Sequence, residues 1–367
     1  MATLTPRADN AEAFKNIVIN GNFDLWQRGN TAGLSVNNNT FFFADRWRIQ
    51  NTAVSNVQVD RSTDVPTVAQ SGFASQYSMR LLNSASPSSP TTAFVNIRYV
   101  VEGLDYQPLH GRPFRVQFWV KSSIVGTYSV KLGNSDGSRT IIKDVTINVA
   151  NTWERKIVDV TGDTSGTWLF DSSAGLRFYL NLQTPVANRS NSYSDWATDT
   201  NTFFSSTAQV GWNVTASSTF FLAQVSIIPG SFDTTAEVPF QRAGKTIANE
   251  VALCQRYYEK SYTLDTVPGT IVSGGTFLFS LTDASNPSAG QVGSIKFSVF
   301  KRATPTVVLR SQDTGGVDTI TISTVASGAP AAYSGINQGG FIAQWSGQAI
   351  GTVKREFYGH WTADAEL

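Results

Sequence analysis

Apolar and polar residues alternate along most of the chain from Asn16 onward. A period of two, with turn residues between the runs, is the pattern of half-buried antiparallel strands. The number of such runs before about Ile228 favours a two-sheet jelly roll over a domain of immunoglobulin size. No strand–helix–strand rhythm appears, which argues against a parallel α/β fold. The clearest runs are Val95, Ile97, Tyr99 and Val101; Phe114, Val116, Phe118 and Val120; and Leu176, Phe178, Leu180 and Leu182.

The period changes after Gly244, where the pattern predicts the one clear helix of the chain. Apolar residues then recur at spacings of four, three and four: Ile247, Val251, Cys254 and Tyr258. This spacing places them on one face of an amphipathic helix. Two interpretations of the apolar stripe stay open. It packs on its own domain, or it meets the same helix of partner chains and forms an oligomer seam around a threefold axis.

Beyond the helix the alternation returns and predicts a second β domain. Phe277, Phe279 and Leu281 form one of its runs. Several short strands in a segment of this length are typical of a small β-sandwich. The sequence therefore predicts an all-β protein with an N-terminal jelly-roll β-sandwich, a short connecting α-helix and a C-terminal small β-sandwich. The expected parts are a polar arm at 1–16, the jelly roll at 17–242, the helix at 243–261 and the second sandwich at 262–367.

Charge and cysteine usage narrow the classes of protein. Charged residues make up 15% of the chain, against roughly 25% in a typical soluble protein. The net charge is +1 and no run of Lys or Arg stands out, which argues against a nucleic-acid partner. The single cysteine excludes an intramolecular disulfide. The chain begins without the plan of a signal peptide and has no apolar run of membrane-spanning length, so we expect cytoplasmic synthesis and no membrane insertion.

Catalytic motifs are few. His110 and His360 lie far apart, and neither has a second ligand at zinc spacing. A glycosidase needs only two carboxylates, and the candidates in irregular stretches are Asp136, Asp171, Asp195 and Asp199. Turn formation is the favoured interpretation of these aspartates, and we expect no enzyme activity. No cofactor is expected, although a structural calcium ion at the ends of the first domain is an alternative, held by Asn22, Asp24 and Asp233.

Aromatic side chains carry the richest candidate chemistry. The longest irregular stretch of the first domain runs from 185 to 206. Flat rings stack on the apolar faces of sugars, and polar side chains beside them bind the hydroxyl groups. The candidate glycan-binding residues lie in this loop or near it in sequence: Tyr193, Asp195, Trp196, Trp168 and Trp212. Packing of the loop is the alternative. The tryptophans of strand-like or opening segments are assigned to the core instead: Trp26, Trp47 and Trp119.

The chain contains the segments NIVINGNFDLWQRG and FFFADRW near its start. These segments resemble a module of bacteriophage and prophage virion proteins, including tail fibres. The central strand pair of carbohydrate-binding-module-like jelly rolls looks like GLDYQPLHGRPFRVQFWVKSS, and the strand and turn that follow look like NTWERKIVDVTGDTSGTW. The strand and helix that end the module are similar to FLAQVSIIPGSFDTTAEVPFQRAGKTIANEVALCQRYYEKSY. The small β domain that closes many such fibres resembles FSVFKRATPTVVL and YGHWTADAEL. The resemblance covers nearly the whole chain from Asn16.

The resemblance implies a tail or head fibre that forms a homotrimer and binds host-surface polysaccharide as its receptor. The arm at 1–16 would attach the protein to other virion proteins, and the protein would reside in the virion after assembly in the host cytoplasm. No catalytic residue is carried across, and the chain lacks the repeated β-helix rungs of sugar-cleaving tailspikes. Three alternatives stay open: a non-adhesive capsid decoration or connector protein, a stand-alone carbohydrate-binding module, and a glycan-cleaving enzyme.

Overall fold

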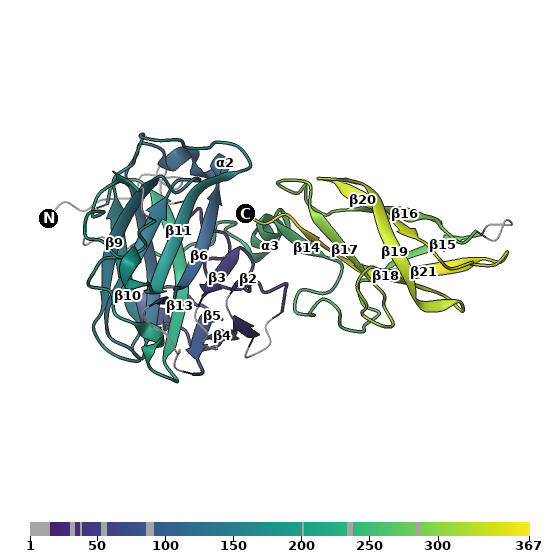
Figure 1. Cartoon of the computed structure of the whole chain (residues 1–367), viewed down its shortest axis with the longest axis horizontal. Helices are drawn as coiled ribbons and strands as arrows, with labels where there is room; N and C mark the ends of the chain where they lie inside the picture. Colours follow the sequence, from purple (N-terminus) through teal and green to yellow (C-terminus); the bar gives the residue numbers. More distant parts are fainter. Residues whose placement is uncertain are drawn as a thin grey trace. The chain divides into compact units, whose positions relative to one another are not determined.

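The computed structural model describes residues 15–29, 34–36, 39–52, 57–85, 92–199, 202–232, 238–282 and 287–367 (Figure 1). Most of the predicted arm at 1–16 and the calcium candidate Asp233 lie outside these ranges. The chain divides into two compact units. The first comprises Met1–Asp24, Thr31–Glu250 and Leu367, and the second comprises Leu25–Asn30 and Val251–Glu366. The fold is all-β, as predicted, and each unit is described by itself below.

The first unit is a jelly-roll β-sandwich of two antiparallel sheets. The six-stranded sheet has the order β1 (Leu34–Val36), β4 (Val57–Ser62), β5 (Ser78–Asn83), β13 (Thr219–Pro229), β7 (Phe114–Ser122) and β10 (Glu154–Val160). The seven-stranded sheet has the order β12 (Ala197–Thr198), β9 (Arg139–Ile147), β8 (Gly126–Gly133), β11 (Ala174–Gln183), β6 (Val95–Glu102), β3 (Trp47–Asn51) and β2 (Asn39–Phe42). Short helices join them: α1 (Val68–Ser71), α2 (Gly103–Tyr106), η3 (Gln107–Leu109), η4 (Val186–Asn188) and η5 (Trp212–Val214).

The core of the first unit lies between the two sheets and confirms the predicted faces of the strands. The alternating residues of β6, β7 and β11 named above are all buried. Residues of the opposite parity therefore point to the outer faces of the sandwich, because successive side chains of a strand alternate. Trp47 is a central residue of this core, with its ring centroid 4.9 Å from that of Tyr99. Trp26 and Trp47 are buried, as predicted for both.

The opening stretch NGNFD makes close contacts with the strands of the sandwich. An added Cβ at Gly21 would lie 2.1 Å from the main-chain oxygen of Val225 in β13, so only glycine fits there. The side chain of Asn20 donates to the main-chain oxygen of Asp45 at 3.0 Å. The indole of Trp47 in turn donates to the main-chain oxygen of Asn20 at 3.0 Å. The first half of the motif that carried the resemblance is thus structural.

The predicted helix is shorter than expected. Helix α3 covers Ile247–Gln255, and the hydroxyl of Thr246 accepts a hydrogen bond from the main-chain N–H of Asn249 at its N-terminus. The boundary between the units falls within α3. Tyr258 lies beyond the helix in strand β14 (Tyr258–Lys260), which pairs with β21 (Arg355–Asp364). This segment is rich in aromatic residues, which favour strands, and tertiary pairing overrides the helical period.

The expected oligomer seam must also be corrected, because most of its residues are not exposed. Cys254 and Tyr258 are buried in the chain itself, and Val251 is half-buried. Ile247 is the one candidate that is well exposed, at 48%. The four residues therefore do not form a continuous exposed stripe. Two of the four residues are instead buried within the chain itself.

The second unit folds around a core of its own, as predicted for the C-terminal sandwich. Its eight described strands are all antiparallel, and the long β21 pairs with four of them. The remaining strands are β15 (Phe277–Leu281), β16 (Gly290–Lys296), β17 (Thr306–Arg310), β18 (Thr319–Ile322), β19 (Ala326–Asn337) and β20 (Gly340–Trp345). The sequence pattern missed β19, because ASGAPAAYSGIN is built of small and polar residues with no apolar alternation.

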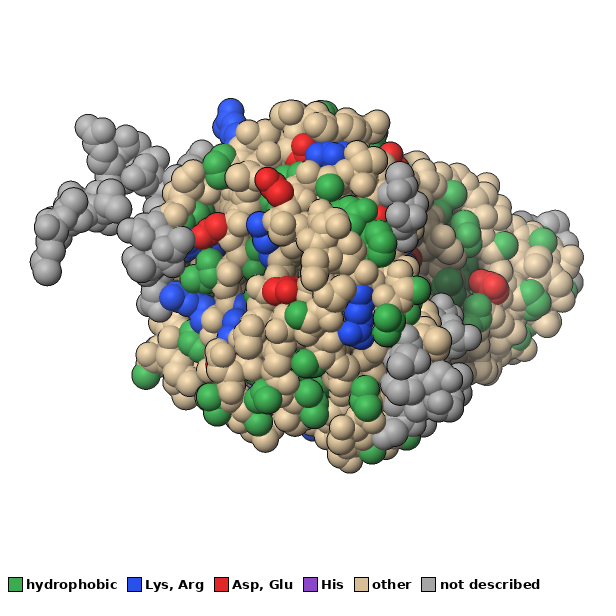
Figure 2. All heavy atoms as spheres, turned by 60° about the vertical axis from the view of Figure 1, so that its left-hand side comes forward, with side chains coloured by type: hydrophobic (Ala, Val, Ile, Leu, Met, Phe, Trp, Pro, Cys, Tyr) green, Lys and Arg blue, Asp and Glu red, His purple; other side chains and the backbone are tan. Residues whose placement is uncertain are grey.

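The low charge expected from the composition is visible on the surface. In Figure 2, Lys, Arg, Asp and Glu side chains lie singly or in small groups among uncharged atoms. Among the described residues, no helix is both long enough and apolar enough to cross a membrane.

Candidate functional site

The outer face of the six-stranded sheet carries aromatic side chains that the core does not use. Trp153, Phe221 and Ala223 pack together there, and Trp119 packs against them. We call these four residues the aromatic platform. Ala223 lies directly opposite Trp119 in the register of β13 and β7, and Phe221 lies opposite Lys121. The ring centroids of Trp153 and Phe221 are 6.1 Å apart. Trp119 is half-buried, so part of its ring faces solvent.

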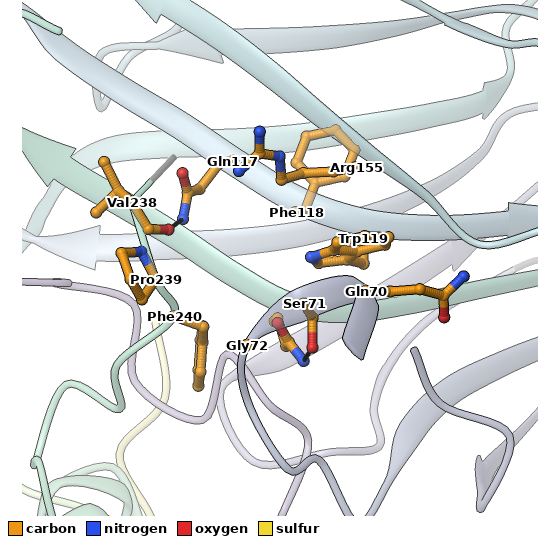
Figure 3. Close-up of a pocket in the computed structure, with 11 residues that line it drawn as sticks. Gln70, Ser71, Gly72, Gln117, Phe118, Trp119, Arg155, Val238, Pro239 and Phe240 are labelled. Carbon is orange, nitrogen blue, oxygen red and sulfur yellow. Dashed lines mark hydrogen bonds between the residues drawn. The ribbon is translucent and has the colours of Figure 1, made fainter. Parts of the chain in front are cut away.

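A pocket of about 110 Å³ lies beside Trp119 (Figure 3). Strand β7 provides one wall, helix α1 a second, and the segment 238–240 a third. Figure 3 shows the nitrogen-bearing end of the Trp119 ring turned toward this space, with Arg155 above it. The lining residues are Gln70, Ser71, Gly72, Gln117, Phe118, Trp119, Arg155, Gln224, Val238, Pro239 and Phe240.

Helix α1 is held in place at the pocket by its own caps. The hydroxyl of Thr67 accepts from the main-chain N–H of Gln70 at 3.3 Å, and the amide oxygen of Gln70 accepts from the main-chain N–H of Thr67 at 2.9 Å. This reciprocal capping box stabilises a helix start in a segment too short to form a helix alone. Gly72 ends the helix with φ of 71°, a left-handed conformation that glycine adopts without strain.

Two glutamine side chains place hydrogen-bonding groups in the pocket wall. Gln117 donates to the main-chain oxygen of Val238 at 2.6 Å, and Gln224 donates to the hydroxyls of Ser71 and Ser75 at 3.0 and 2.8 Å. Both side chains are buried, and the amide oxygen of each has no partner among the described residues. A buried acceptor without a donor costs about 1–3 kcal/mol. A ligand hydroxyl in the pocket would supply the missing donor.

The position of Gln224 depends on an irregularity of strand β13. The register between β13 and β7 shifts between Ala223 and Ser226, and Gln224 has a φ of 52°. A bulge of this kind re-aims a side chain that a regular strand would direct elsewhere. Strain in a non-glycine residue often marks a functional position.

Next to the pocket, charged groups are paired around the aromatic platform. The ammonium of Lys121 forms an ion pair with Asp64 and lies 4.5 Å from the ring centroid of Phe221. Asp64 also accepts from the indole N–H of Trp153 at 2.9 Å. These contacts fix the rings of Trp153 and Phe221. The indole N–H of Trp119 makes no hydrogen bond with any described residue, so it can serve a ligand.

The loop residues predicted from sequence do not form this site. Trp212, Trp168 and Tyr193 are buried, with exposed fractions of 0%, 6% and 6%. Their rings are covered by the protein and offer no stacking face to a sugar, which corrects that expectation. Trp196 is half-buried and Asp195 is exposed.

Packing of the loop, the alternative interpretation, explains these positions. The ring of Trp168 stacks on Tyr106 with centroids 4.8 Å apart and meets the edge of Trp196 at 5.5 Å. The main-chain oxygen of Tyr193 accepts from the N–H of Ile142 at 2.7 Å, which ties the loop to strand β9.

The carboxylates considered for catalysis have structural partners. Asp136 and Asp171 accept main-chain hydrogen bonds from Ser138 and Ser173, which lower the pKa of each carboxyl. This is the turn geometry expected of such aspartates. Asp199 is buried and pairs with the ammonium of Lys131 at 3.3 Å.

The two described calcium candidates, Asn22 and Asp24, contact each other, and Asp24 also contacts Arg242. The amide of Asn22 donates to Asp24 at 3.0 Å, and Asp24 pairs with Arg242 at 2.7 Å. Among the described residues, no three His, Cys, Asp or Glu side chains converge as metal ligands.

Trp119 is the functional candidate that sequence reasoning placed wrongly. It was assigned to the core, yet its neighbours Phe118 and Val120 are the residues that point inward. The same alternation that identified strand β7 requires Trp119 to point outward. The parity of the strand was therefore a sufficient signal. The pocket itself was not visible in the sequence, because α1 and segment 238–240 reach β7 only through the fold.

No family model and no curated protein matches the chain. Among solved structures, it is similar to the tailspike protein 4 enzymatically active domain of bacteriophage CBA120, with 14% identity, a TM-score of 0.34, and 59% of this chain and 22% of that chain covered. It is also similar to a putative sugar binding protein from Bacteroides thetaiotaomicron, with 12% identity, a TM-score of 0.33 and 59% and 100% covered. It is also similar to a family 11 carbohydrate-binding module of Clostridium thermocellum, with 12% identity and a TM-score of 0.28. This match covers 56% of this chain and 98% of that chain. The chain thus spans less than a quarter of the tailspike domain.

Proposed function

We propose that the first unit binds a glycan on the outer face of its six-stranded sheet. The observation that carries this proposal is the grouping of Trp119 with Gln117 and Gln224. A half-exposed aromatic ring lies beside two buried amide oxygens that lack donors. An aromatic face and a few well-placed polar groups are what a sugar ring requires, because its C–H face is apolar and its rim is made of hydroxyls.

In the bound state, a sugar ring would stack on Trp119 and extend along the platform. One hydroxyl would donate to the amide oxygen of Gln117 and another to that of Gln224, while the indole N–H of Trp119 would donate to a sugar oxygen. The guanidinium of Arg155 borders the same pocket and adds further donors. The pocket is small, so it would hold part of one sugar unit, and the rest of a chain would lie across the sheet.

We propose binding without cleavage at this site. None of the described residues that line the pocket is a carboxylate, and a glycosidase mechanism uses two of them across the scissile bond. The pocket therefore has groups for orienting a sugar and lacks the acid and base for hydrolysing it.

For the whole chain we propose a role as a homotrimeric tail or head fibre of a bacteriophage that recognises a host-surface polysaccharide. The sequence resemblance and the charge-poor, disulfide-free composition support this role. The candidate site supports the adhesive form of it. A stand-alone carbohydrate-binding module would use the same site, whereas a non-adhesive decoration or connector protein would not need it.

Glycan binding is tested by affinity electrophoresis of the full chain in gels that contain neutral or acidic polysaccharides, with the variants Trp119→Ala and Trp196→Ala. We expect at least one polysaccharide to retard the wild type. Trp119→Ala should then weaken binding about tenfold or more, as for a central aromatic contact, and Trp196→Ala should weaken it less than about threefold. Equal effects of the two substitutions, or retardation by no polysaccharide in the panel, would refute the assigned site.

The virion role is tested separately. Proteomics of purified phage particles from a host that produces the protein should detect it as a structural component. Light scattering after size exclusion should give a mass of three chains. A monomer that binds polysaccharide and is missing from particles would favour the stand-alone module.

A further inference from the structure

Three arginines lie together on the outer face of the seven-stranded sheet, on the side of the sandwich away from the platform. Arg48, Arg98 and Arg177 come from β3, β6 and β11 and line a cleft of about 150 Å³. Arg48 and Arg98 occupy directly opposite positions in the register of β3 and β6. Among the described residues, no Asp or Glu side chain forms an ion pair with any of the three. Like charges directly across a sheet destabilise it, so this arrangement needs a reason.

The guanidinium of Arg98 is held rigidly in this cleft. Its Nε donates to the amide oxygen of Asn96 at 2.8 Å, and one terminal nitrogen donates to the amide oxygen of Gln50. Its central carbon lies 4.9 Å from the ring centroid of Tyr179. These partners are all uncharged, so they orient the group and leave its charge uncompensated. Burial, and then the positive charges of Arg48 and Arg177, lower the pKa of Arg98.

The other positively charged side chains around the cleft have too few anionic partners to balance the positive charge of the cleft. The side chain of Arg177 makes no hydrogen bond or ion pair with any described residue. Arg48 donates to the main-chain oxygen of Leu367 at 2.9 Å, and its Nε is buried without a partner. Lys131 lies close enough for its pKa to be lowered by Arg98 and Arg177, after burial, and its carboxylate partner is Asp199.

We propose that this cleft binds an oxyanion carried by a sugar, with Arg98 and Arg177 as its main contacts. A planar guanidinium can donate two parallel hydrogen bonds to a carboxylate, sulfate or phosphate, and Arg98 is already oriented to do so. The bound anion would also relieve the repulsion among the three arginines.

The size and isolation of the cleft favour a single anionic group over a nucleic acid. A nucleic acid requires a stripe of cations along its phosphates. Here the arginines surround one small cleft, the whole chain has a net charge of +1, and the outer face of the other sheet has its charges paired. An acidic polysaccharide presents isolated carboxylates or sulfates on neutral rings, which matches one localised site.

The inference takes from the proposed function only the idea that the ligand is a glycan, and it lies on a different sheet. The two can therefore fail independently. If glucuronate binds at the arginines while Trp119→Ala changes no polysaccharide binding, the platform proposal is wrong and this one stands. If Trp119→Ala abolishes binding and the arginines bind nothing, the reverse holds.

The test is an NMR titration of the full-length protein, observed at the arginine Nε–Hε resonances. The sugar probes are glucose, glucuronate, glucose 6-sulfate and glucose 6-phosphate, and the controls are acetate, inorganic phosphate and a short DNA duplex. We expect at least one charged sugar to shift the Arg98 and Arg177 resonances and glucose to shift neither. The best of the three charged sugars identifies the oxyanion.

Variants assign the effect to the cleft. Arg177→Gln should weaken binding of the charged sugar about tenfold or more, and it should fold normally because it removes no described hydrogen bond. Arg98→Lys should also weaken binding, because an ammonium keeps the charge and loses the planar pair of donors. Arg112→Gln, an exposed arginine of the same unit, should have no effect.

Three results would overturn the proposal. Shifts of neither arginine resonance with any charged sugar would remove the site. Acetate or inorganic phosphate binding as tightly as the charged sugars would reduce it to a simple anion site. Tighter binding of the DNA duplex, lost in Arg177→Gln, would make it a nucleic-acid contact.

Discussion

On both outer faces of the first unit, charged residues of neighbouring strands lie directly opposite each other. On one face the opposed residues have opposite charges, and on the other face they have the same charge. On the six-stranded sheet, Asp60 lies directly across from Arg80 and Asp159 directly across from Arg115, with ion-pair distances of 2.6 and 2.7 Å. On the seven-stranded sheet, Arg98 lies directly across from a second arginine. Both sets are outward-facing positions of half-buried strands. The difference teaches that strand register, and not composition, decides whether a charge is neutralised.

The paired face and the unpaired face suit different ligands. Where cross-strand ion pairs neutralise the charges, the surface that remains for binding is the aromatic platform, which suits the apolar face of a sugar. Where arginines oppose each other, the surface keeps a local positive potential and suits an anion. Cross-strand pairs contribute roughly 0.2–1 kcal/mol each, so a protein can retain an unfavourable pair when binding offsets it.

Removing an ion pair from the six-stranded sheet should change the unfolding free energy more than any other substitution considered. Asp159→Ala removes one carboxylate partner of Arg115, whose side chain is 0% exposed. Because Asp159 is itself about one-third exposed, we expect a loss of about 2–3 kcal/mol, at or below the range for fully buried pairs. Urea unfolding followed by tryptophan fluorescence measures it. Asp195→Ala, at an exposed loop position, should cost less than about 0.5 kcal/mol. A similar small loss in both variants would show that the buried Arg115 does not depend on Asp159.

The sequence contained enough information to predict which side of each strand faces the core. Period-two runs predicted β6, β7 and β11, and the inward residues of these strands are buried as expected. The same parity also contained Trp119, which was nevertheless assigned to the core because buried tryptophans are common. Strands without an apolar run, such as β19, were missed. The all-β class and the two-sandwich plan followed from alternation, because alternation is the direct consequence of strand geometry.

Introducing an ion pair on the seven-stranded sheet should change the unfolding free energy by an intermediate amount. Arg48→Glu places a carboxylate opposite Arg98 and copies the Asp60–Arg80 arrangement of the other sheet. We expect a gain in unfolding free energy of up to about 1 kcal/mol over Arg48→Gln, which removes the same side-chain contacts without adding a charge. Thermal and urea unfolding measure the gain.

The same variant should lose affinity for charged sugars, because the new carboxylate occupies the guanidinium of Arg98. Stability that rises while binding is retained would show that the ligand does not contact Arg98. If Arg48→Glu and Arg48→Gln were equally stable, the side chains at positions 48 and 98 would not interact electrostatically, although they lie opposite each other in the sheet.

Neither proposed binding face could be predicted from the sequence as a site. Arg48, Arg98 and Arg177 are separated by long stretches of chain and look like isolated cations until β3, β6 and β11 become neighbours. The pocket at Trp119 likewise needs α1 and segment 238–240, which reach it only in the fold. The loop residues Trp168 and Tyr193 misled for a physical reason: an aromatic in an irregular segment can equally well be the anchor that packs the segment down.

The smallest expected change in stability is the one caused by added salt. Sodium chloride screens repulsion over about 10 Å at 0.1 M, so it should stabilise the wild type slightly at the unpaired face. We expect a gain of a few tenths of a kcal/mol between low salt and 0.1 M, and a smaller gain in Arg177→Gln, where one like charge is absent.

Sodium sulfate at low concentration and matched ionic strength sharpens this measurement. Screening is equal for the two salts, so any extra stabilisation of the wild type by sulfate that Arg177→Gln lacks must come from an oxyanion bound at the cleft, by mass action. Equal stabilisation of both proteins by both salts would mean that the arginines neither repel each other measurably nor hold an anion. The contrast between the two faces would then be one of register alone.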